Sequence, residues 1–436
     1  MRVVKEETND GAVPFPKLPP AGFFGKSVHE AAATSTKATD VSAGSLRVAV
    51  LTGGGDKPYA HGLAACLISQ GVSFDFIGSD ELDAPELRQN PLVRVLNLRG
   101  EMRPDAGMAR KALRVLIYYW RLLRYAAKAR PKLFHVLWNN RFAVLDRTLL
   151  MLYYRALGKR IVLTVHNVNA GQRDGNDSFL NRLTLRIQYL LADHIFVHTR
   201  QMSQALRTGF SIADAKVSVI PFGINSTVPN TALTAAEARQ RLGLSSTHKV
   251  MLFFGNIAPY KGLEYLLDAA ALLAPRGTDY RLIIAGKPKN SEAYWEKIRQ
   301  RLSLSELRAS VIERIEYVPD ADTEIYFKAA DVLVLPYVHI FQSGVLFLGY
   351  NFGLPVIASD VGSLREDIVE GKTGFVCIPR DPIDLAKSIE TYFSSELYRR
   401  RDAGRQEIRD FANERYSWTR VGEITREVYR SVLARR

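Results

Sequence analysis

The feature that most constrains the fold of this 436-residue chain is a short apolar run followed by a turn and an amphipathic stretch, which recurs along most of the sequence. The first example starts at residues 46–51, LRVAVL, passes through Thr-Gly-Gly-Gly and reaches helix-like residues 60–71 before a second apolar run at 74–78. Short apolar runs bounded by glycine turns are typical of buried strands in parallel sheets. The alternation therefore predicts an α/β fold with doubly wound, Rossmann-like sheets.

Two such halves are expected, because the chain exceeds the usual size of one hydrophobic core. Further strands are predicted at residues 133–138, 160–167, 194–199, 216–223, 250–256, 281–287, 311–319, 331–337 and 355–359, with helices at 145–157 and 180–191. A connector rich in Pro and Thr separates the halves, so we predict one domain over 45–230 and a second over 231–411, facing a cleft. Residues 1–44 lack periodic apolar spacing and are predicted to be a disordered tail. A final helix over 416–436 is expected either to cap the second domain or to return to the first.

Composition limits the partners. Lysine and arginine number 59 against 45 Asp and Glu, a formal net charge of +14 that favours nucleotide diphosphates, anionic lipids or nucleic acids. The sequence contains no compact aromatic and basic motif of a known nucleic-acid reader, which disfavours nucleic acid. Cys66 and Cys377 lie in apolar runs and suit buried thiols in a reducing cytosol. We expect a cytoplasmic protein without a resident metal, because metal-ligand spacing, a membrane span and a secretory signal are all missing from the sequence.

Residues 336–375 carry the strongest site motif. Gln342, Ser343 and Gly344 stand where a loop turns into an apolar helical run, and Gly353 before Leu-Pro predicts the end of that helix. Free backbone amides at such a helix start can hold a phosphate. The motif therefore predicts a donor that carries phosphate groups.

The start of the second domain adds another candidate phosphate contact. Asn256 follows a strand, and Lys261 with Gly262 heads an amphipathic helix. A lysine beside free helix amides can share a diphosphate with them. The competing interpretation is a solvated lysine in a turn.

Residues 335–377 resemble a known family. The order LPY, small-residue loop, short helix, GLPVIASDVGSLREDI and GKTGFVC is similar to the nucleotide-sugar site of family 4 glycosyltransferases, retaining enzymes with the two-domain GT-B fold. The resemblance implies transfer of a sugar, of hexosyl type, from a nucleotide-diphosphate donor to a carbohydrate or lipid-linked acceptor, as in polysaccharide or glycolipid assembly. It also implies that residues 412–436 pack back on the first domain. Members typically carry two glutamates at the places of Ile340 and Leu348, and an arginine at the place of Asn256, so these charges are missing here.

The first glycine turn supplies candidate residues of the first domain. Gly54 and Gly55 let the backbone approach a ligand closely, although a simple tight turn is the commoner explanation. The resemblance places this loop near the donor phosphates and the acceptor. Asp56 and Lys57 follow on the same loop and are expected on the acceptor side.

Other strand ends complete the predicted site. The resemblance implies that His166 helps to position the transferred sugar, with Asn167 on the acceptor side, against the alternative of a hydrogen-bonded structural histidine. Lys287 and Tyr317 follow two later strands and are predicted contacts of the donor's base, against the alternative of two ordinary loops.

A helix over residues 109–130 is expected to carry a cationic stripe. Five of its basic residues fall within about 40° of one direction at about 100° per residue: Arg110, Arg114, Arg121, Arg124 and Lys128. Apolar residues occupy much of the other side: Leu113, Leu116, Trp120, Leu123 and Ala127. Such a helix can lie on an anionic membrane, or it can be an ordinary solvated helix whose polar face is basic.

The missing charges leave other functions open. A catalytically silent paralogue that binds a partner or a sugar nucleotide is one, and a sugar-nucleotide epimerase or a phosphorylase on the same two-domain plan is another. For the enzyme hypothesis, Gln342 or Tyr350 is a candidate to replace the lost glutamates as a partner of donor hydroxyls. Glu366 is expected to form a capping box with Ser363.

Overall fold

The structure is a computed structural model that describes residues 46–435 apart from 55–56, 102–106, 141, 174–176, 225–227, 278, 290 and 304–305. Leu46–Arg436 form one compact unit. The predicted tail, residues 1–44, and the candidate residues Gly55 and Asp56 lie outside the described residues.

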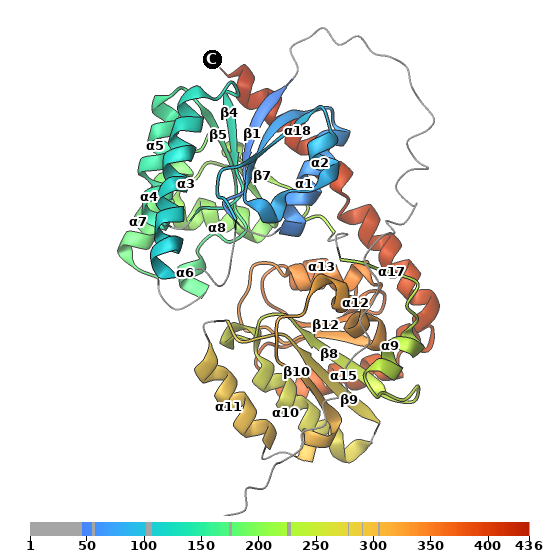
Figure 1. The fold of residues 1–436 in the computed structure, drawn as a ribbon. Coiled ribbons are helices and arrows are strands. Elements are labelled where there is room, and N and C mark those ends of the chain that lie inside the picture. The colour runs from blue at the N-terminus through green and yellow to red at the C-terminus, as the bar shows by residue number, and fades with distance from the viewer. Residues whose placement is uncertain are drawn as a thin grey trace, which may run out of the picture. The chain divides into compact units, whose positions relative to one another are not determined.

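Two parallel sheets form the framework (Figure 1). The first has the order β3-β2-β1-β4-β5-β6-β7 and contains β1 (Arg47–Leu51), β2 (Ser73–Gly78), β3 (Val93–Asn97), β4 (Leu133–Val136), β5 (Arg160–Thr164), β6 (His194–Val197) and β7 (Val217–Val219). The second has the order β10-β9-β8-β11-β12-β13 and contains β8 (Lys249–Phe254), β9 (Tyr280–Ala285), β10 (Val311–Arg314), β11 (Val332–Leu335), β12 (Val356–Ser359) and β13 (Gly374–Cys377). The predicted fold, two doubly wound Rossmann-like sheets, is confirmed.

Helices connect successive strands in both halves. The first half contains α1 (Lys57–Ser69), α2 (Pro85–Gln89), α3 (Met108–Lys128), α4 (Ala143–Arg147), α5 (Leu149–Ala156), α6 (Ala170–Arg173), α7 (Phe179–Leu191) and α8 (Arg200–Phe210). The second contains α9 (Ala235–Arg241), α10 (Leu263–Leu273), α11 (Glu292–Ser303), α12 (Asp320–Ala329), α13 (Gly344–Asn351), α14 (Leu364–Asp367), α15 (Pro382–Ser394), α16 (Glu396–Arg399) and α17 (Arg401–Arg415). The last helix of the chain is α18 (Trp418–Ala434). Short 3₁₀ helices lie at Asp80–Leu82, Asp214–Lys216, Pro259–Lys261, Ala274–Arg276 and Glu306–Ser310.

Some elements differ from the sequence-based expectation. Strand β3 was not predicted, because it is an edge strand with alternating burial and an exposed Arg94 rather than an apolar run. The helix expected over 145–157 is divided at Thr148, whose φ of −118° and ψ of −86° are not helical. The predicted boundary at residue 412 falls inside α17, and the domain boundaries stay predictions.

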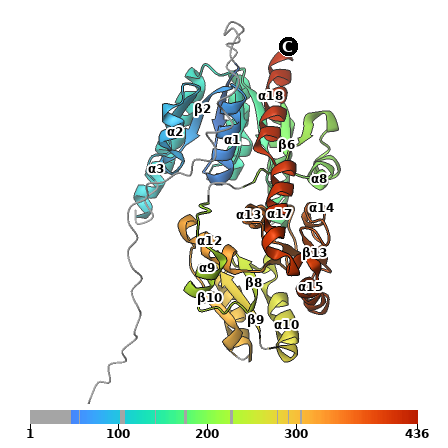
Figure 2. The same ribbon diagram turned by 90° about the vertical axis from the view of Figure 1, so that its right-hand side faces the viewer.

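The last helix packs on the first sheet's side of the molecule. Helix α18 contacts α1, and Figure 2 shows the two running side by side. Val421, Tyr429 and Val432 belong to the same buried cluster as Leu63 of α1. The Tyr429 hydroxyl lies 2.5 Å from Nδ1 of His135 on β4, so the C-terminus is tied to the interior of the first half. Of the two predicted positions for this helix, the structure therefore has the return to the first domain.

Both cysteines are free and buried, as predicted. Among the described residues, no helix is both long and apolar enough to cross a membrane.

Candidate functional site

A cavity of about 420 Å³ lies beside the N-terminus of α13, and we call it the donor cavity. Five predicted donor residues line it: Asn256, Lys261, Gln342, Ser343 and Gly344. Residues from distant parts of the chain complete the lining: Pro58, Tyr59, Phe222, Gly223, Tyr260, Tyr337, Ile340, Val345, Leu348 and Trp418. No Asp or Glu is among these lining residues, so the only charge that the described wall contributes is that of Lys261.

Lys261 is buried, at 5% exposure, which contradicts the interpretation as a solvated lysine. Its Nζ donates only a long hydrogen bond, 3.5 Å, to the Phe254 carbonyl, and lies 5.3 Å from the centre of the Tyr337 ring. Burial lowers the pKa of Lys261, and no carboxylate among the described residues pairs with it. A buried cation without a counter-charge is costly, and an anionic ligand in the cavity would offset that cost.

Backbone geometry holds Lys261 in this position. The next residue, Gly262, has φ +63°, and a Cβ there would stand 2.1 Å from the Pro336 carbonyl oxygen. Only glycine permits this close approach. The 3₁₀ turn Pro259–Lys261 is thereby brought against the loop after β11, from which α13 begins.

The helix start predicted at residues 342–344 is confirmed. Ser343 is the N-cap of α13, but its side chain makes no capping bond and instead lies 3.3 Å from the Tyr337 hydroxyl. The first amides of an α-helix have no intrahelical partners, so those of Gly344 and Val345 are available at the cavity wall. Oε1 of Gln342 is a buried polar atom without a hydrogen-bond partner. A cation, helix amides and an unpartnered amide oxygen thus surround one space.

The glycine loop after β1 has a structural reason for its glycines. Gly53 and Gly54 have φ of +60° and +75°. A Cβ on Gly53 would stand 2.1 Å from the Trp138 carbonyl oxygen, and one on Gly54 would stand 1.4 Å from Nη1 of Arg99. Neither Gly54 nor the exposed Lys57 lines the donor cavity, whereas the two residues after Lys57 do.

His166 does not line the donor cavity, but it contacts the ring of Tyr59, which does. Its ring stacks on Trp138 at 4.2 Å and meets the cavity residue Tyr59 edge-on at 4.7 Å. Burial, together with the neighbouring His198, lowers the pKa of His166 far below its usual value, so the imidazole is neutral at physiological pH.

The protonated nitrogen of His166 follows from its neighbours. His198 has Nδ1 3.4 Å from the Ile220 carbonyl and Nε2 3.1 Å from Nδ1 of His166. If His198 donates to that carbonyl, its Nε2 is an acceptor and His166 must donate from Nδ1. Nε2 of His166, which is buried and without a partner, then carries a lone pair.

The remaining candidates lie outside the cavity lining. Asn167 accepts a hydrogen bond from the Asn169 amide at 3.0 Å and so shapes a turn. The ammonium of the exposed Lys287 lies 5.6 Å from the ring centre of Tyr317, which is 66% exposed. The backbone carbonyl of Lys287 accepts from the Ile257 amide, which keeps this pair at the strand edge next to Asn256. Their contact with a base stays a prediction.

Two further expectations are wrong. Tyr350 is fully buried, donates to the Asp367 carbonyl and lies 3.0 Å from the Thr373 hydroxyl, so it cannot reach a donor hydroxyl. Glu366 forms no capping box, because Ser363 makes no capping bond and its hydroxyl donates to Asp367 instead. Gln342 remains the available candidate of the pair proposed for donor hydroxyls.

The aromatic wall of the cavity was missed from the sequence. The Trp418 indole donates to the Ile224 carbonyl at 2.8 Å, and Phe222 stacks on Phe347 of α13 at 5.4 Å between ring centres. A Cβ on Gly62 or Gly223 would collide with the Trp418 ring, which explains both glycines. The only signal in the sequence was a tryptophan at the first turn of the last helix, and its meaning depends on where that helix packs.

Two family profiles match successive parts of the chain. The profile described as "Glycosyltransferase Family 4" matches residues 53–228, and the one described as "Glycosyl transferases group 1" matches residues 248–395. D-inositol 3-phosphate glycosyltransferase of Corynebacterium urealyticum is 27% identical over 248 residues, which is 55% of this chain and 57% of that protein. The enzyme of the same name from Corynebacterium diphtheriae is 28% identical over 269 residues, 61% of this chain and 62% of the relative. The chain thus spans little more than half the length of these curated relatives.

Solved structures show the same fold. Sucrose-phosphate synthase from Thermosynechococcus elongatus has a TM-score of 0.71 at 19% identity, covering 89% of this chain and 99% of that one. HepE of Anabaena, solved in complex with UDP-glucose, has a TM-score of 0.68 at 16% identity, covering 88% of this chain and all of that one. With the two profiles covering most of the sequence, the chain belongs to the GT-B glycosyltransferases of family 4 and group 1.

Proposed function

We propose that this protein transfers a sugar, with retention, from a nucleotide-diphosphate donor to a carbohydrate or lipid-linked acceptor. The observation that carries the proposal is the buried Lys261, which has no carboxylate partner among the described residues and faces the donor cavity next to free helix amides. Membership of the glycosyltransferase family supports the reaction class. The structural neighbour HepE holds UDP-glucose, which supports a nucleotide sugar as the donor.

The chemistry requires a stabilised leaving group. As the bond to the sugar breaks, negative charge grows on the diphosphate, and a preorganised cation with helix amides stabilises it most in a site sheltered from water. Lys261 and the amides of Gly344 and Val345 supply these groups. Among the described residues, no three His, Cys, Asp or Glu side chains are grouped so as to hold a metal ion, and we propose that the reaction uses none.

Contacts with the sugar must come from uncharged groups. Where most family members carry glutamates, Ile340 and Leu348 present apolar side chains to the cavity. Oε1 of Gln342 is the unpartnered acceptor within reach of the same space, and we assign it to a donor hydroxyl. We assign Nε2 of His166 to a hydroxyl of the sugar or the acceptor, which would approach past Tyr59.

The acceptor side is proposed to work at a membrane surface, in exopolysaccharide or glycolipid assembly. Helix α3 buries Tyr118, Tyr119, Leu122 and Ala126, and exposes the opposite apolar residues Leu113, Leu116 and Trp120 at 57%, 63% and 59%. The basic stripe flanks this exposed apolar stripe. An apolar face that enters a bilayer beside cations at the head groups is the arrangement of an interfacial helix.

Donor binding is tested by a thermal-shift screen of nucleotide sugars, starting with UDP-glucose. A ligand that binds the folded state stabilises it by mass action and so raises the melting temperature. At a hundredfold excess over Kd the added stability is about 2.7 kcal/mol. We expect at least one nucleotide sugar, and its nucleoside diphosphate, to stabilise the protein. A screen in which none does would refute the proposal.

Turnover separates the enzyme from its alternatives. Incubation of the bound donor with membrane extract should release nucleoside diphosphate and place the labelled sugar on an acceptor. Binding without release would favour the catalytically silent paralogue, and release with a free epimerised sugar, or dependence on phosphate, would favour an epimerase or a phosphorylase. Retention is read from the anomeric configuration of the product by NMR.

A further inference from the structure

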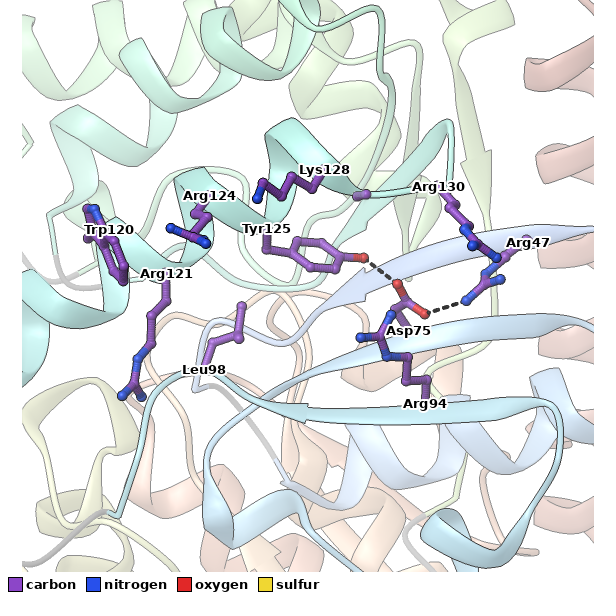
Figure 3. Close-up of a pocket in the computed structure, with 11 residues that line it drawn as sticks. Arg47, Asp75, Arg94, Leu98, Trp120, Arg121, Arg124, Tyr125, Lys128 and Arg130 are labelled. Atoms are coloured by element: carbon purple, nitrogen blue, oxygen red, sulfur yellow. Dashed lines mark hydrogen bonds and ion pairs between the residues drawn. The ribbon is translucent and has the colours of Figure 1, made fainter.

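A second cavity, of about 620 Å³, opens next to the C-terminal half of α3, and we call it the cationic cleft (Figure 3). Six basic residues line it: Arg47, Arg94, Arg121, Arg124, Lys128 and Arg130. It shares no lining residue with the donor cavity, and its three strand residues, Arg47, Asp75 and Arg94, lie at the starts and middles of β1, β2 and β3. The proposed chemistry of sugar transfer does not use this cleft, although Arg121, Arg124 and Lys128 also belong to the basic stripe of α3.

The charges of the cleft are not balanced from within. Asp75 is the one carboxylate among its lining residues, and it is 1% exposed. One Asp75 oxygen accepts a hydrogen bond from the Tyr125 hydroxyl at 2.7 Å, and the other pairs with Arg47 at 3.3 Å. The other five cations have no carboxylate partner among the described residues, and an anion from outside would relieve their mutual repulsion.

The cleft is built from several elements and is more than one face of a helix. Arg47 comes from β1, Asp75 from β2 and Arg94 from β3, while Arg130 follows the end of α3 (Figure 3). Asp75 and Arg94 are direct neighbours in the sheet register. The Tyr125–Asp75–Arg47 contacts join the helix to the strands and form a polar floor under the free guanidinium groups. Several planar guanidinium forks that line one cleft are suited to the oxygens of a phosphate.

The surroundings of the cleft point to a lipid as the source of that phosphate. Trp120 lines the cleft and is 59% exposed, with the Arg124 guanidinium 5.5 Å from its ring centre. Leu116, one turn before Trp120, is 63% exposed and continues the apolar stripe of α3. A soluble phosphate compound would leave the apolar stripe beside its site exposed, whereas the acyl chains of a lipid would cover it.

We propose that the cationic cleft binds the phosphate head group of an anionic membrane lipid, preferring a phosphomonoester with its higher charge. The head group enters between Arg94 and the basic residues of α3, and the acyl chains run along Trp120 and Leu116. This inference rests on the proposed membrane contact of α3, and it adds a head-group site to what would otherwise be attraction of a helix to any anionic surface.

The test measures binding of the full chain to phosphatidylcholine vesicles that contain either phosphatidic acid or phosphatidylserine, matched in surface potential. Wild type should bind the phosphatidic acid vesicles at least about fivefold more tightly, since one cation at an anionic surface changes binding by about that factor. Arg94→Gln and Arg130→Gln, which lie outside the helical stripe, should remove this preference, because they should weaken binding to phosphatidic acid vesicles more than binding to phosphatidylserine vesicles. Arg430→Gln on α18, an exposed arginine far along the chain, is the matched control and should keep the preference.

Other outcomes overturn the proposal in distinguishable ways. Equal binding of wild type to both vesicles refutes the head-group site while leaving the membrane contact intact, and absence of binding to either refutes both. If glycerol 3-phosphate or inorganic phosphate binds the cleft as tightly as the vesicles do, the proposal that a lipid supplies the phosphate is refuted. A variant is shown to be folded if its melting temperature, and the increase that nucleotide sugars cause in it, are the same as in wild type. If no nucleotide sugar stabilises the protein but the lipid preference is retained, the proposed sugar transfer alone is refuted.

Discussion

Replacing Lys261 by methionine should have opposite effects on the free and the donor-bound protein. Methionine keeps the length of the side chain and removes the charge. In the free protein Lys261 is 5% exposed, and among the described residues it has no carboxylate partner and makes only one hydrogen bond, at 3.5 Å. Its removal therefore relieves a desolvation cost. We expect the variant to unfold at a higher temperature, with about 1–3 kcal/mol of added stability.

Donor binding should change in the other direction. A charge-assisted hydrogen bond contributes about 1.5–3 kcal/mol, so its loss should weaken binding of the nucleotide diphosphate about 10- to 150-fold. Calorimetric titration measures the affinity. Thermal unfolding without and with donor measures both the stability of the free protein and its stabilisation by the donor. Lys372→Met, at an exposed turn, is the matched control and should alter neither quantity.

The pH dependence gives a further check. The folded-state pKa of Lys261 is below its ordinary value of 10.5, because burial disfavours the charged form. The free wild type should therefore gain stability as pH rises through the folded pKa toward 10.5, whereas donor affinity should fall over that range as the ammonium loses its proton. Lys261→Met should show neither trend. A variant that is less stable when free and binds the donor as wild type does would refute the reasoning.

Three further predictions concern the surroundings of the donor cavity. Gly62→Ala places a Cβ 2.1 Å from the Trp418 ring, so it should lower the free energy of unfolding in urea by about 1–3 kcal/mol and weaken donor binding. A Cβ on Gly209 meets nothing within 4 Å, so the control Gly209→Ala should be neutral or stabilising. Burial raises the pKa of Asp367 to about 6, so between about pH 4 and 6 the folded state holds a proton that the unfolded chain has lost. As pH rises through that range, the free energy of unfolding of wild type should fall by about 2–3 kcal/mol relative to that of Asp367→Asn, and above it the difference between the two proteins should stay constant. Unfolding at several pH values measures this difference. His166→Phe, which keeps a ring stacked on Trp138, should lower kcat about 10²- to 10⁴-fold and weaken donor binding by no more than about tenfold, the contribution of one neutral hydrogen bond. An unchanged kcat would remove His166 from the reaction.

Local patterns determined much of the fold. Apolar runs such as residues 46–51 are buried strands because a parallel sheet covered on both faces needs continuous apolar segments, and that requirement is visible in one dimension. The helix start at Ser343 and Gly344 and the helix end at Gly353 were also readable, since capping chemistry acts over a few residues. The edge strand β3 was not predicted because two of its five residues, Arg94 and Asn97, are exposed and interrupt the apolar run.

The site depended on tertiary structure wherever distant segments meet. Lys261 was identifiable as a candidate, but its burial follows from the close approach of Gly262 to the Pro336 carbonyl, which no local pattern encodes. Tyr59 and Trp418 come together only because α18 returns to α1. Tyr350 shows the converse, because its hydroxyl was a plausible donor contact until packing directed it into the core.

The sequence by itself determined that this chain forms two doubly wound α/β sheets with a phosphate-binding helix start, and that the family's two glutamates are replaced by Ile340 and Leu348. Only the tertiary structure decided that Lys261 is a buried cation unpaired among the described residues, that aromatic residues of five segments wall the donor cavity, and that cations of α3 line one cleft together with Arg47 and Arg94. The division has a physical reason. Secondary structure and capping depend on neighbours a few residues away, whereas burial, desolvation and the balance of charge in a cavity depend on contacts that the folded chain makes across hundreds of residues.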